Sequence, residues 1–377
     1  MMHQVCTECI MDSTDPTISF NEKGVCNYCQ TWRNYKERYG YVENGLEVWE
    51  NKVLPKIVSR GANTKYNCVV GLSGGIDSSY LCFRLKNYKK LRPLIVHVTS
   101  IFDTEGSKRN VQRIVNNTGF DIIYLSVDLP DYLAVQKAYL KASVLDADVP
   151  ADYLIEAFTR ITAKKHKIKF VLSGGNYMAD AFMPYSWTFA NKLDLTNLLA
   201  INKKFGDGNK LNSFPKFGLF QELLNRRVYG LEYCTPLNFF GYSRFTALTE
   251  LKKVCGYEAY GDKHDENIFT RFYQKYMLPV KFGVDKRKAN YSNYIRAGVW
   301  SREHALTEIT KTFYNPEQYQ VDRKHILRVL DWSDSFFDFV MSLPLRNHEA
   351  FSNSQWIYTL EKSVIKIIHT VRNKLAY

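Results

Sequence analysis

Short apolar runs alternate with amphipathic stretches from Tyr66 to about residue 176. The apolar runs have the length and composition of buried β-strands, and they cover residues 67–72, 93–98, 121–127 and 168–176, the last with a glycine turn at its end. Between them, apolar side chains recur at helical spacing over residues 77–88, 107–118, 130–142 and 151–166. Strands that alternate with helices predict an α/β fold with a doubly wound parallel sheet.

The pattern changes near residue 200, after which clear strands disappear and apolar positions keep helical spacing. We therefore expect a sheet domain over residues 65–200, followed by a mostly helical C-terminal domain over 201–377 that completes the active site. A cysteine-rich module over residues 1–40 comes before them, and a helical connector over 41–64 joins the two.

The first predicted strand ends in a glycine turn, Ser73-Gly74-Gly75, and a helix follows. Two adjacent glycines let a ligand approach the main chain closely. Asp77 and the two serines after it suit a helix N-terminus, whose free N–H groups and dipole attract a phosphate. The turn is therefore a candidate anion-binding loop.

Three known glycine-containing motifs can be compared with this turn. No lysine follows the glycines, which excludes the common NTPase phosphate loop, and the dinucleotide fingerprint G-x-G-x-x-G is also absent. Residues 71–75 satisfy G-x-S-x-G, the nucleophile elbow of hydrolases, but too few strands precede them to supply an oxyanion hole. A hydrolase and a purely structural turn both remain weaker alternatives.

A second glycine turn, Ser173-Gly174-Gly175-Asn176, ends the fourth predicted strand. Ligands of doubly wound sheets bind beyond the carboxyl ends of the strands, so both turns can face one crevice. A tight structural loop is the alternative. On the functional interpretation, Asn176 or the nearby Asp180 contacts the nucleotide, its Mg²⁺ or the acceptor.

Four of the eight cysteines form a C-x₂-C-x₁₆-C-x₂-C pattern, namely Cys6, Cys9, Cys26 and Cys29. This spacing fits a closed, structural, zinc-ribbon-like site, with an iron–sulfur cluster or free thiols as alternatives. The other four are isolated and fit buried structural residues: Cys68, Cys82, Cys234 and Cys255.

The net charge is +13, with the excess of basic residues in residues 63–377. A basic field steers RNA, but it equally steers ATP and an anionic nucleotide sugar. No run of 18 apolar residues occurs, and the first ten residues lack the apolar core of a signal peptide. We expect a cytoplasmic protein.

Basic side chains and aromatic residues concentrate between Tyr260 and Leu306. A solvated charged surface is one interpretation. The other is a lid of cations that stabilises the charge of departing pyrophosphate, with Lys286 and Arg287 as the preferred pair and Lys281 beside them. His264 fits a core or surface histidine as well as an acid–base group.

The string from Ser73 to Ser79 resembles the SGGxDS signature of the PP-loop ATP pyrophosphatases. That resemblance implies that ATP is split into AMP and pyrophosphate, and that Asp77 helps to hold Mg²⁺. It also implies that the pyrophosphate end of ATP is cradled by Ser73, Gly74, Gly75, Ser78 and Ser79.

Over nearly its whole length the chain resembles the N-acetyl sugar amidotransferases, a branch of the PP-loop enzymes. The resemblance rests on the cysteine module, both glycine turns, and the stretches "KASVLDADVPADYLI" and "TRFYQKYMLPVKFGVDKRKA". The chain departs from this family in one place. After the second predicted strand a turn resembling "VDNGWN" is expected, but residues 99–110 read "TSIFDTEGSKRN". The resemblance implies that this loop lies near the adenine or the acceptor, so the departure bears on the choice of sugar and on the nucleotide contacts.

The resemblance implies conversion of an N-acetyl amide on a nucleotide-linked sugar into an acetamidine, through an adenylated imidate and ammonia. The chain has neither an amino-terminal cysteine, since Met2 and His3 stand there, nor a G-x-C-x-G elbow. We therefore expect a separate glutaminase partner, which a barrel subunit that channels ammonia could accompany. An RNA-modifying, tRNA thiolase-like enzyme is the main alternative, and a zinc-bearing scaffold that binds nucleotide without turnover is a weaker one.

Overall fold

The computed structural model describes residues 3–38, 44–357 and 359–361. Parts of the predicted module (1–40), connector (41–64) and C-terminal domain (201–377) lie outside these ranges, and the domain boundaries stay predictions. Among the described residues, no helix is both long and apolar enough to cross a bilayer.

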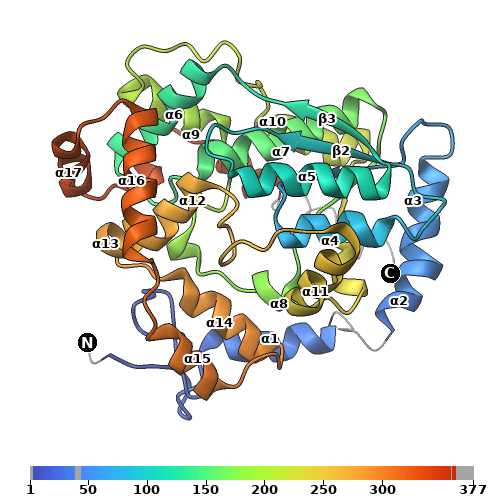
Figure 1. Cartoon of the computed structure of the whole chain (residues 1–377), viewed down its shortest axis with the longest axis horizontal. Helices are drawn as coiled ribbons and strands as arrows, with labels where there is room; N and C mark the ends of the chain where they lie inside the picture. Colours follow the sequence, from blue (N-terminus) through green and yellow to red (C-terminus); the bar gives the residue numbers. More distant parts are fainter. Residues whose placement is uncertain (1–2, 39–43, 358, 362–377) are drawn as a thin grey trace, which may run out of the picture.

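The sheet domain contains a five-stranded parallel sheet, of which β2 and β3 are labelled in the upper part of Figure 1. Its strand order is β3-β2-β1-β4-β5, with bounds β1 Cys68–Gly71, β2 Pro93–Val98, β3 Asp121–Leu125, β4 Phe170–Leu172 and β5 Glu232–Cys234. The residues of β1 and β2 are almost all buried, as the continuous apolar runs predict. The predicted α/β class with a doubly wound parallel sheet is confirmed.

Helices cover both faces of the sheet. Helix α7 (Val149–Lys165) packs on β1, β2 and β4, whereas α4 (Ile76–Leu85) packs against α5 (Glu105–Thr118) and α11 (Arg244–Cys255) on the opposite face. Helix α4 begins directly after the first glycine turn. Other helices of this half are α6 Leu129–Ala142, α8 Tyr177–Asp180, α9 Leu195–Phe205 and α10 Leu219–Leu224.

The expectation that strands end near residue 200 is wrong for one strand. The edge strand β5 pairs in parallel with β4 through three residues. A strand of three residues, partly exposed, leaves too short a pattern to detect in a sequence. The rest of this region is helical, with α12 Ile268–Phe272, α13 Leu278–Phe282, α14 Lys286–Arg296, α15 Arg302–Ile309, α16 Pro316–Leu330 and α17 Asp334–Ser342.

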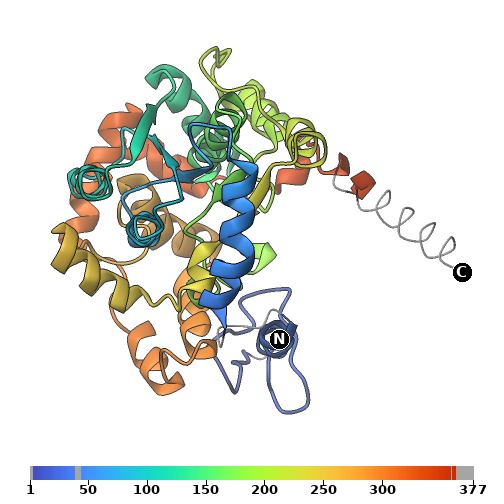
Figure 2. The same ribbon diagram turned by 90° about the vertical axis from the view of Figure 1, so that its right-hand side faces the viewer.

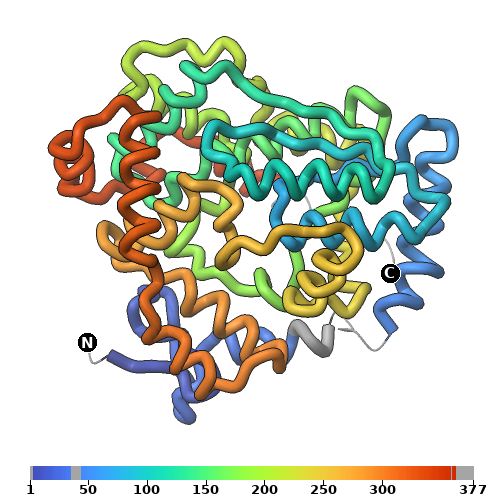
Figure 3. Tube along the Cα trace, viewed as in Figure 1, coloured from blue at the N-terminus to red at the C-terminus, as the bar shows by residue number. Residues whose placement is uncertain are grey.

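The cysteine-rich segment and α1 (Asn27–Arg38) lie beside α14 and α15, far from them in sequence (Figures 1 and 3). The apolar core is continuous there, because the four cysteines belong to the same buried cluster as residues of α6, α7 and the C-terminal helices. After the cysteine-rich segment, α2 (Gly45–Val48) and α3 (Leu54–Arg60) run along the side of the sheet domain, as Figure 2 shows.

Candidate functional site

A cavity of about 560 Å³ opens at the carboxyl ends of β1, β2 and β4. It is lined by residues of both glycine turns, by the loop after β2, by α7 and by segments of the C-terminal half. This is the edge at which doubly wound sheets bind their ligands. The predicted crevice shared by the two turns is thus present in the structure.

The first turn is held by its own serines. The N–H of Gly75 donates to Ser73 Oγ at 3.2 Å, and the Ser73 N–H donates to Ser78 Oγ at 3.2 Å. Gly74 has a φ of +85°, and a Cβ there would stand 2.5 Å from the carbonyl oxygen of Ser107. Both the backbone angle and the close approach to α5 therefore require glycine at this position.

The second turn repeats one hydrogen bond of the first, although among the glycines of the two turns only Gly74 has a positive φ. The N–H of Gly175 donates to Ser173 Oγ at 3.2 Å. A Cβ on Gly174 would stand 2.9 Å from the backbone nitrogen of Ser78. The two turns therefore touch, and the second glycine turn is packed directly on the start of α4.

Of the predicted loop residues, three do not line the cavity. Gly74 lies behind the turn, where its carbonyl accepts hydrogen bonds from the Tyr257 and Tyr260 hydroxyls. Ser79 is fully buried, and its hydroxyl has no partner among the described residues. Asn176 caps α8, since its Oδ1 accepts from the Ala179 N–H at 2.9 Å. The remaining predicted residues of the turns line the cavity: Ser73, Gly75, Asp77, Ser78, Gly174 and Gly175.

Lys263 joins the two turns inside the cavity. Its ammonium pairs with Asp180 of α8 and lies 3.8 Å from Asp77 Oδ2. Burial alone would lower the pKa of Lys263, but the carboxylates of Asp180 and Asp77 raise it above its usual value. Asp77 also accepts a hydrogen bond from the Tyr242 hydroxyl. An ammonium thus stands between the two carboxylates predicted to hold Mg²⁺, and their role as magnesium ligands stays a prediction.

The predicted cation lid is only partly assembled. Lys286 lines the cavity, and no hydrogen bond or ion pair engages its ammonium within the described ranges. Lys281 and Arg287 do not reach the cavity. Lys281 donates to the carbonyl oxygens of Val340, Met341 and Leu343 at the end of α17.

Arg287 pairs with Asp285 and lies over the ring of Phe313, with 4.1 Å from its guanidinium carbon to the ring centroid. The two neighbours Lys286 and Arg287 leave the N-terminus of α14 in different directions, because successive helical residues are about 100° apart. Of this pair, Lys286 faces the cavity and Arg287 does not.

The loop after β2 shapes the mouth of the cavity. It pairs with the start of the C-terminal helices, because Thr104 N–H donates to the Glu266 carbonyl at 3.0 Å and Ile268 N–H donates to the Phe102 carbonyl at 2.8 Å. This places the Glu266 carboxyl 2.8 Å from where a Cβ on Gly75 would stand. Burial raises the pKa of Glu266 to about 7, and the nearby Asp77 adds to the shift.

Further ionisable groups line the cavity, and apart from His264 the sequence alone did not single them out. Arg244 begins α11 and faces Asp77. His264 is neutral at pH 7, because burial and the neighbouring Lys263 lower its pKa to about 3. Asp146, Asp148 and Asp152 approach from the start of α7, and Lys192 bridges the first and third of them. Burial raises the pKa of Asp148 to about 6.

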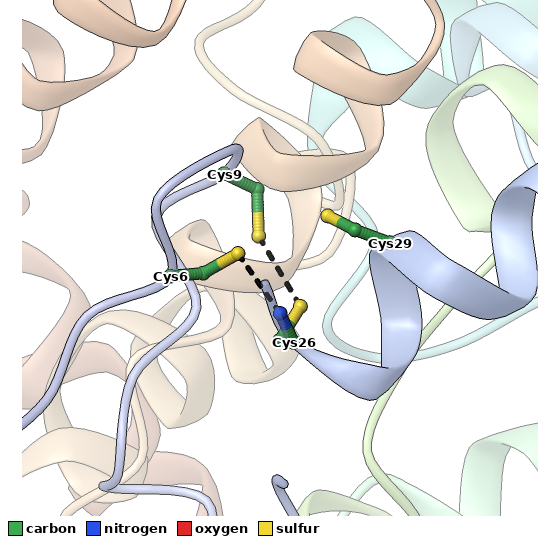
Figure 4. Close-up of side chains that lie close together, drawn as sticks. All are labelled: Cys6, Cys9, Cys26 and Cys29. Atoms are coloured by element: carbon green, nitrogen blue, oxygen red, sulfur yellow. Dashed lines mark hydrogen bonds between the residues drawn. The ribbon is translucent and has the colours of Figure 1, made fainter. Parts of the chain in front are cut away.

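The four-cysteine site is assembled as predicted. The Sγ atoms of Cys6, Cys9, Cys26 and Cys29 all lie within 4.8 Å of one another and are buried (Figure 4). Two of them, Cys9 and Cys26, are 3.7 Å apart. A tetrahedral zinc ion with bonds of about 2.3 Å places its sulfurs about 3.8 Å apart. The thiolates therefore fit a single ion. The isolated Cys68 and Cys82 are buried among apolar side chains.

Solved structures similar to this chain are remote in both sequence and geometry. A U34-tRNA thiolase, NcsA, from Methanococcus maripaludis with its 4Fe–4S cluster is 11% identical, covers 92% of this chain and 91% of its own, and has a TM-score of 0.34. The NH3-dependent NAD synthetase from Campylobacter jejuni is 12% identical with a TM-score of 0.29 over 78% of this chain and 96% of its own. At these scores no conclusion about the reaction follows.

Comparison of sequences finds two further similarities. An uncharacterized protein from Methanocaldococcus jannaschii is 27% identical over 127 residues, which are 33% of this chain and 44% of that protein, so less than half of that relative is matched. Residues 266–364 match the model of the C-terminal domain of WbpG-like lipopolysaccharide (LPS) biosynthesis proteins. The segment that includes the helices closing the cavity is thus similar to a domain of lipopolysaccharide-biosynthesis proteins, which supports the resemblance for this part of the chain.

Proposed function

We propose that this chain is an ATP-dependent, AMP-forming amidotransferase that converts the N-acetyl group of a nucleotide-linked sugar into an acetamidine. One observation carries the proposal. The two Ser-Gly-Gly turns share a cavity that is closed by Lys263 and Glu266, at the start of the region similar to the lipopolysaccharide-biosynthesis proteins. An anion site for ATP and a sugar-related domain thus meet in one cavity.

The first step activates the amide. The amide oxygen of the acceptor attacks the α-phosphorus of ATP, the bond from this phosphorus to the bridging oxygen breaks, and pyrophosphate leaves. Ser73, Ser78 and the N–H groups at the start of α4 would hold the departing pyrophosphate. Lys263, Arg244 and Lys286 carry the positive charges that stabilise it. Catalysis is mainly positioning and electrostatic stabilisation, and no protein nucleophile is required.

The second step exchanges oxygen for nitrogen. Ammonia attacks the carbon of the adenylated imidate, and AMP departs with the former amide oxygen. The net change in the sugar is replacement of O by NH. Glu266, whose pKa lies near 7, is the carboxyl in the cavity that is suited to accept a proton from the incoming ammonia.

Ammonia would come from a separate glutaminase subunit, and a barrel-type subunit would channel it. The support is chemical: a cysteine glutaminase needs a reactive thiolate, whereas burial raises the pKa of Cys68 and Cys82. Glutamine hydrolysis by the purified chain alone would contradict this part of the proposal.

Two metal ions belong to the proposal. Zinc would be held by Cys6, Cys9, Cys26 and Cys29, where it stabilises the N-terminal module. Mg²⁺ would accompany ATP and offset the charge of its phosphates, with Asp77 as the first candidate to hold it and Asp180 as the second.

The proposal is tested with ATP labelled in its α-phosphate, Mg²⁺, an ammonium salt and a panel of UDP- and CMP-linked N-acetyl sugars. We expect labelled AMP with at least one sugar, and a sugar product in which mass spectrometry detects NH in place of O. Asp77→Ala should abolish both products. AMP formation with bulk tRNA, and with none of the sugars, would contradict the proposal and favour an RNA-modifying enzyme.

A further inference from the structure

Helix α14 touches two sites that are far apart in sequence. Its first residue, Lys286, lines the cavity, and its last residue, Arg296, lies over the cysteine cluster. The Arg296 guanidinium stands 3.7 Å from the Sγ atoms of both Cys9 and Cys29. A short rigid element therefore connects the four-cysteine module with the proposed nucleotide site.

Hydrogen bonds and an ion pair hold the four-cysteine module against α14 along the length of this helix. The Ile10 N–H donates to Ser292 Oγ at 3.2 Å, and Lys288 pairs with Asp12 at 2.5 Å. From α15, Arg302 donates to the carbonyl oxygens of Cys9 and Cys6, at 3.1 and 3.0 Å. These contacts reach the two ends of the turn that carries the first cysteine pair. The position of α14 is thus tied to the shape of the module.

A chain of hydrogen bonds continues from Arg296 into the cavity. Its other guanidinium nitrogen donates to Asn293 Oδ1 at 2.7 Å. The amide nitrogen of Asn293, a residue only 1% exposed, donates to the carbonyl oxygens of Ala179 and Phe182 at 2.9 and 3.1 Å. Those two residues flank Asp180.

Asp180 is the carboxylate that pairs with Lys263, and Lys263 in turn faces Asp77 of the first turn. The series of contacts therefore runs without a gap from the thiolates to both glycine turns. Asp180 is its exposed member, whereas the other partners are buried or half-buried, so water competes weakly with most of these contacts.

We propose that Arg296 and Asn293 couple the four-cysteine module to the nucleotide cavity, with Asn293 as a positioning residue for Asp180. Metal binding in the module and nucleotide binding in the cavity each order the same helix, so each strengthens the other. This inference rests on the proposed function in one respect, namely that the cavity binds ATP. It does not depend on the acceptor or on the amidotransferase reaction.

The test measures zinc retention and uses the zinc-loaded full chain. Zinc transfer to a chromogenic chelator is followed with and without Mg²⁺ and α,β-methylene-ATP, whose binding is first measured by calorimetry. We expect the nucleotide analogue to slow zinc transfer by about five-fold or more, since couplings between sites are commonly of this size. Reciprocity holds for equilibrium affinities and not for rates, so zinc-depleted protein should bind the analogue more weakly by the factor by which the analogue raises the zinc affinity in equilibrium competition with the chelator.

Asn293→Ala should reduce the effect of the analogue on zinc transfer to less than about two-fold, because it removes the link between Arg296 and the Asp180 turn without touching a thiolate. Asn197→Ala is the matched control. Asn197 is also a fully buried asparagine that donates to two carbonyl oxygens, those of His348 and Ser352, but it does not line the cavity or contact the module. This variant should keep the full effect, even if its melting temperature falls as much.

The outcomes separate the two proposals. If the analogue binds and zinc transfer is unchanged, or if Asn293→Ala keeps the full effect, the coupling is overturned while the proposed function stands. If the analogue and inorganic pyrophosphate both fail to bind, the nucleotide site and the coupling are overturned together. Coupling in a chain that binds the analogue but modifies no sugar would uphold the inference and contradict the amidotransferase.

Discussion

The two Ser-Gly-Gly turns have the same three residues, the same position after neighbouring strands and the same internal hydrogen bond. In each, the N–H of the second glycine donates to the serine hydroxyl at 3.2 Å. They differ in the length of the helix that each one begins. The first turn leads into the ten-residue helix α4, and the second into the four-residue helix α8.

Because of this difference, we assign different roles to the two turns. A helix of ten residues has enough aligned peptide dipoles to support an anion at its start, whereas a single turn has few. The second turn instead supplies a close-packed backbone, because Gly174 lies against Ser78, and a carboxylate, Asp180, that holds Lys263 in place. The same three residues thus form one candidate binding loop and one support for it.

The largest expected effect comes from the contact between the turns. Gly174→Ala puts a Cβ 2.9 Å from the Ser78 nitrogen, which is backbone and cannot rotate away. Overpacking of this kind costs about 1–3 kcal/mol, so the affinity for α,β-methylene-ATP should fall by about 10- to 100-fold in calorimetry. In Gly175→Ala the nearest atom is 3.6 Å from the new Cβ, so its affinity should stay unchanged. Equal losses of affinity in the two variants would contradict these different roles of the turns.

The next effect concerns the ammonium between the turns. Lys263→Met leaves Asp77 and Asp180 without their shared cation, so affinity for the analogue should fall about ten-fold, as expected when a buried charge pair is broken. Lys281→Met is the control. It frees three carbonyl oxygens at the end of α17 and should lower the melting temperature without changing the affinity. A loss of affinity only in Lys281→Met would show that the cations are wrongly assigned.

A smaller effect is the pH dependence of analogue affinity at the first turn. Glu266 lies against Gly75, and its pKa is raised from 4.5 to about 7. Above pH 7 its charge repels phosphate, so affinity for the analogue should fall several-fold between pH 6 and 8. Glu266→Gln should remove this part of the pH dependence.

The same shift affects stability. The native state keeps the Glu266 proton between about pH 4.5 and 7 while the unfolded chain loses it, so this group lowers the free energy of unfolding as the pH rises through that window. Glu266→Gln should flatten the slope of stability against pH there. An unchanged slope, measured by urea unfolding at several pH values, would contradict the raised pKa.

The smallest effect belongs to the cap of the second turn. Asn176→Ala removes the side chain that caps α8, and loss of such a cap costs about 1 kcal/mol of stability. Affinity for the analogue should change by less than about three-fold, because Asn176 does not line the cavity. Ser301→Ala, which removes the cap of α15, provides a matched loss of stability. A far greater loss of affinity in Asn176→Ala would indicate that this residue contacts the nucleotide.

Patterns within short stretches of the sequence were sufficient to predict much of the fold and the cysteine site. Continuous apolar runs predicted β1 to β4, and the glycine turns predicted the edge of the sheet that holds the cavity. The cysteine spacing predicted a metal site whose four sulfurs do converge. In each case the signal lies within a few consecutive residues or in a regular period.

Contacts between distant segments were not predictable in this way. Lys263 and Arg287 look alike in a basic stretch, but only the fold shows that one reaches Asp77 and the other pairs with Asp285. Arg244 and Glu266 belong to no local motif. Strand β5 is too short to give a period. Lys286 and Arg287 are neighbours in the sequence, but only the fold shows that Lys286 alone of the two lines the cavity.

The central claim is that the oxygen of the sugar's N-acetyl group becomes bonded to the α-phosphorus of ATP. The most direct measurement uses an acceptor sugar, chosen from the panel by AMP formation, with ¹⁸O in its acetamido carbonyl. We predict that the label appears in the phosphate of AMP and is absent from pyrophosphate, while the sugar gains NH. AMP without ¹⁸O, with the label still in the sugar or released to water, would contradict the adenylated imidate and with it the proposed reaction.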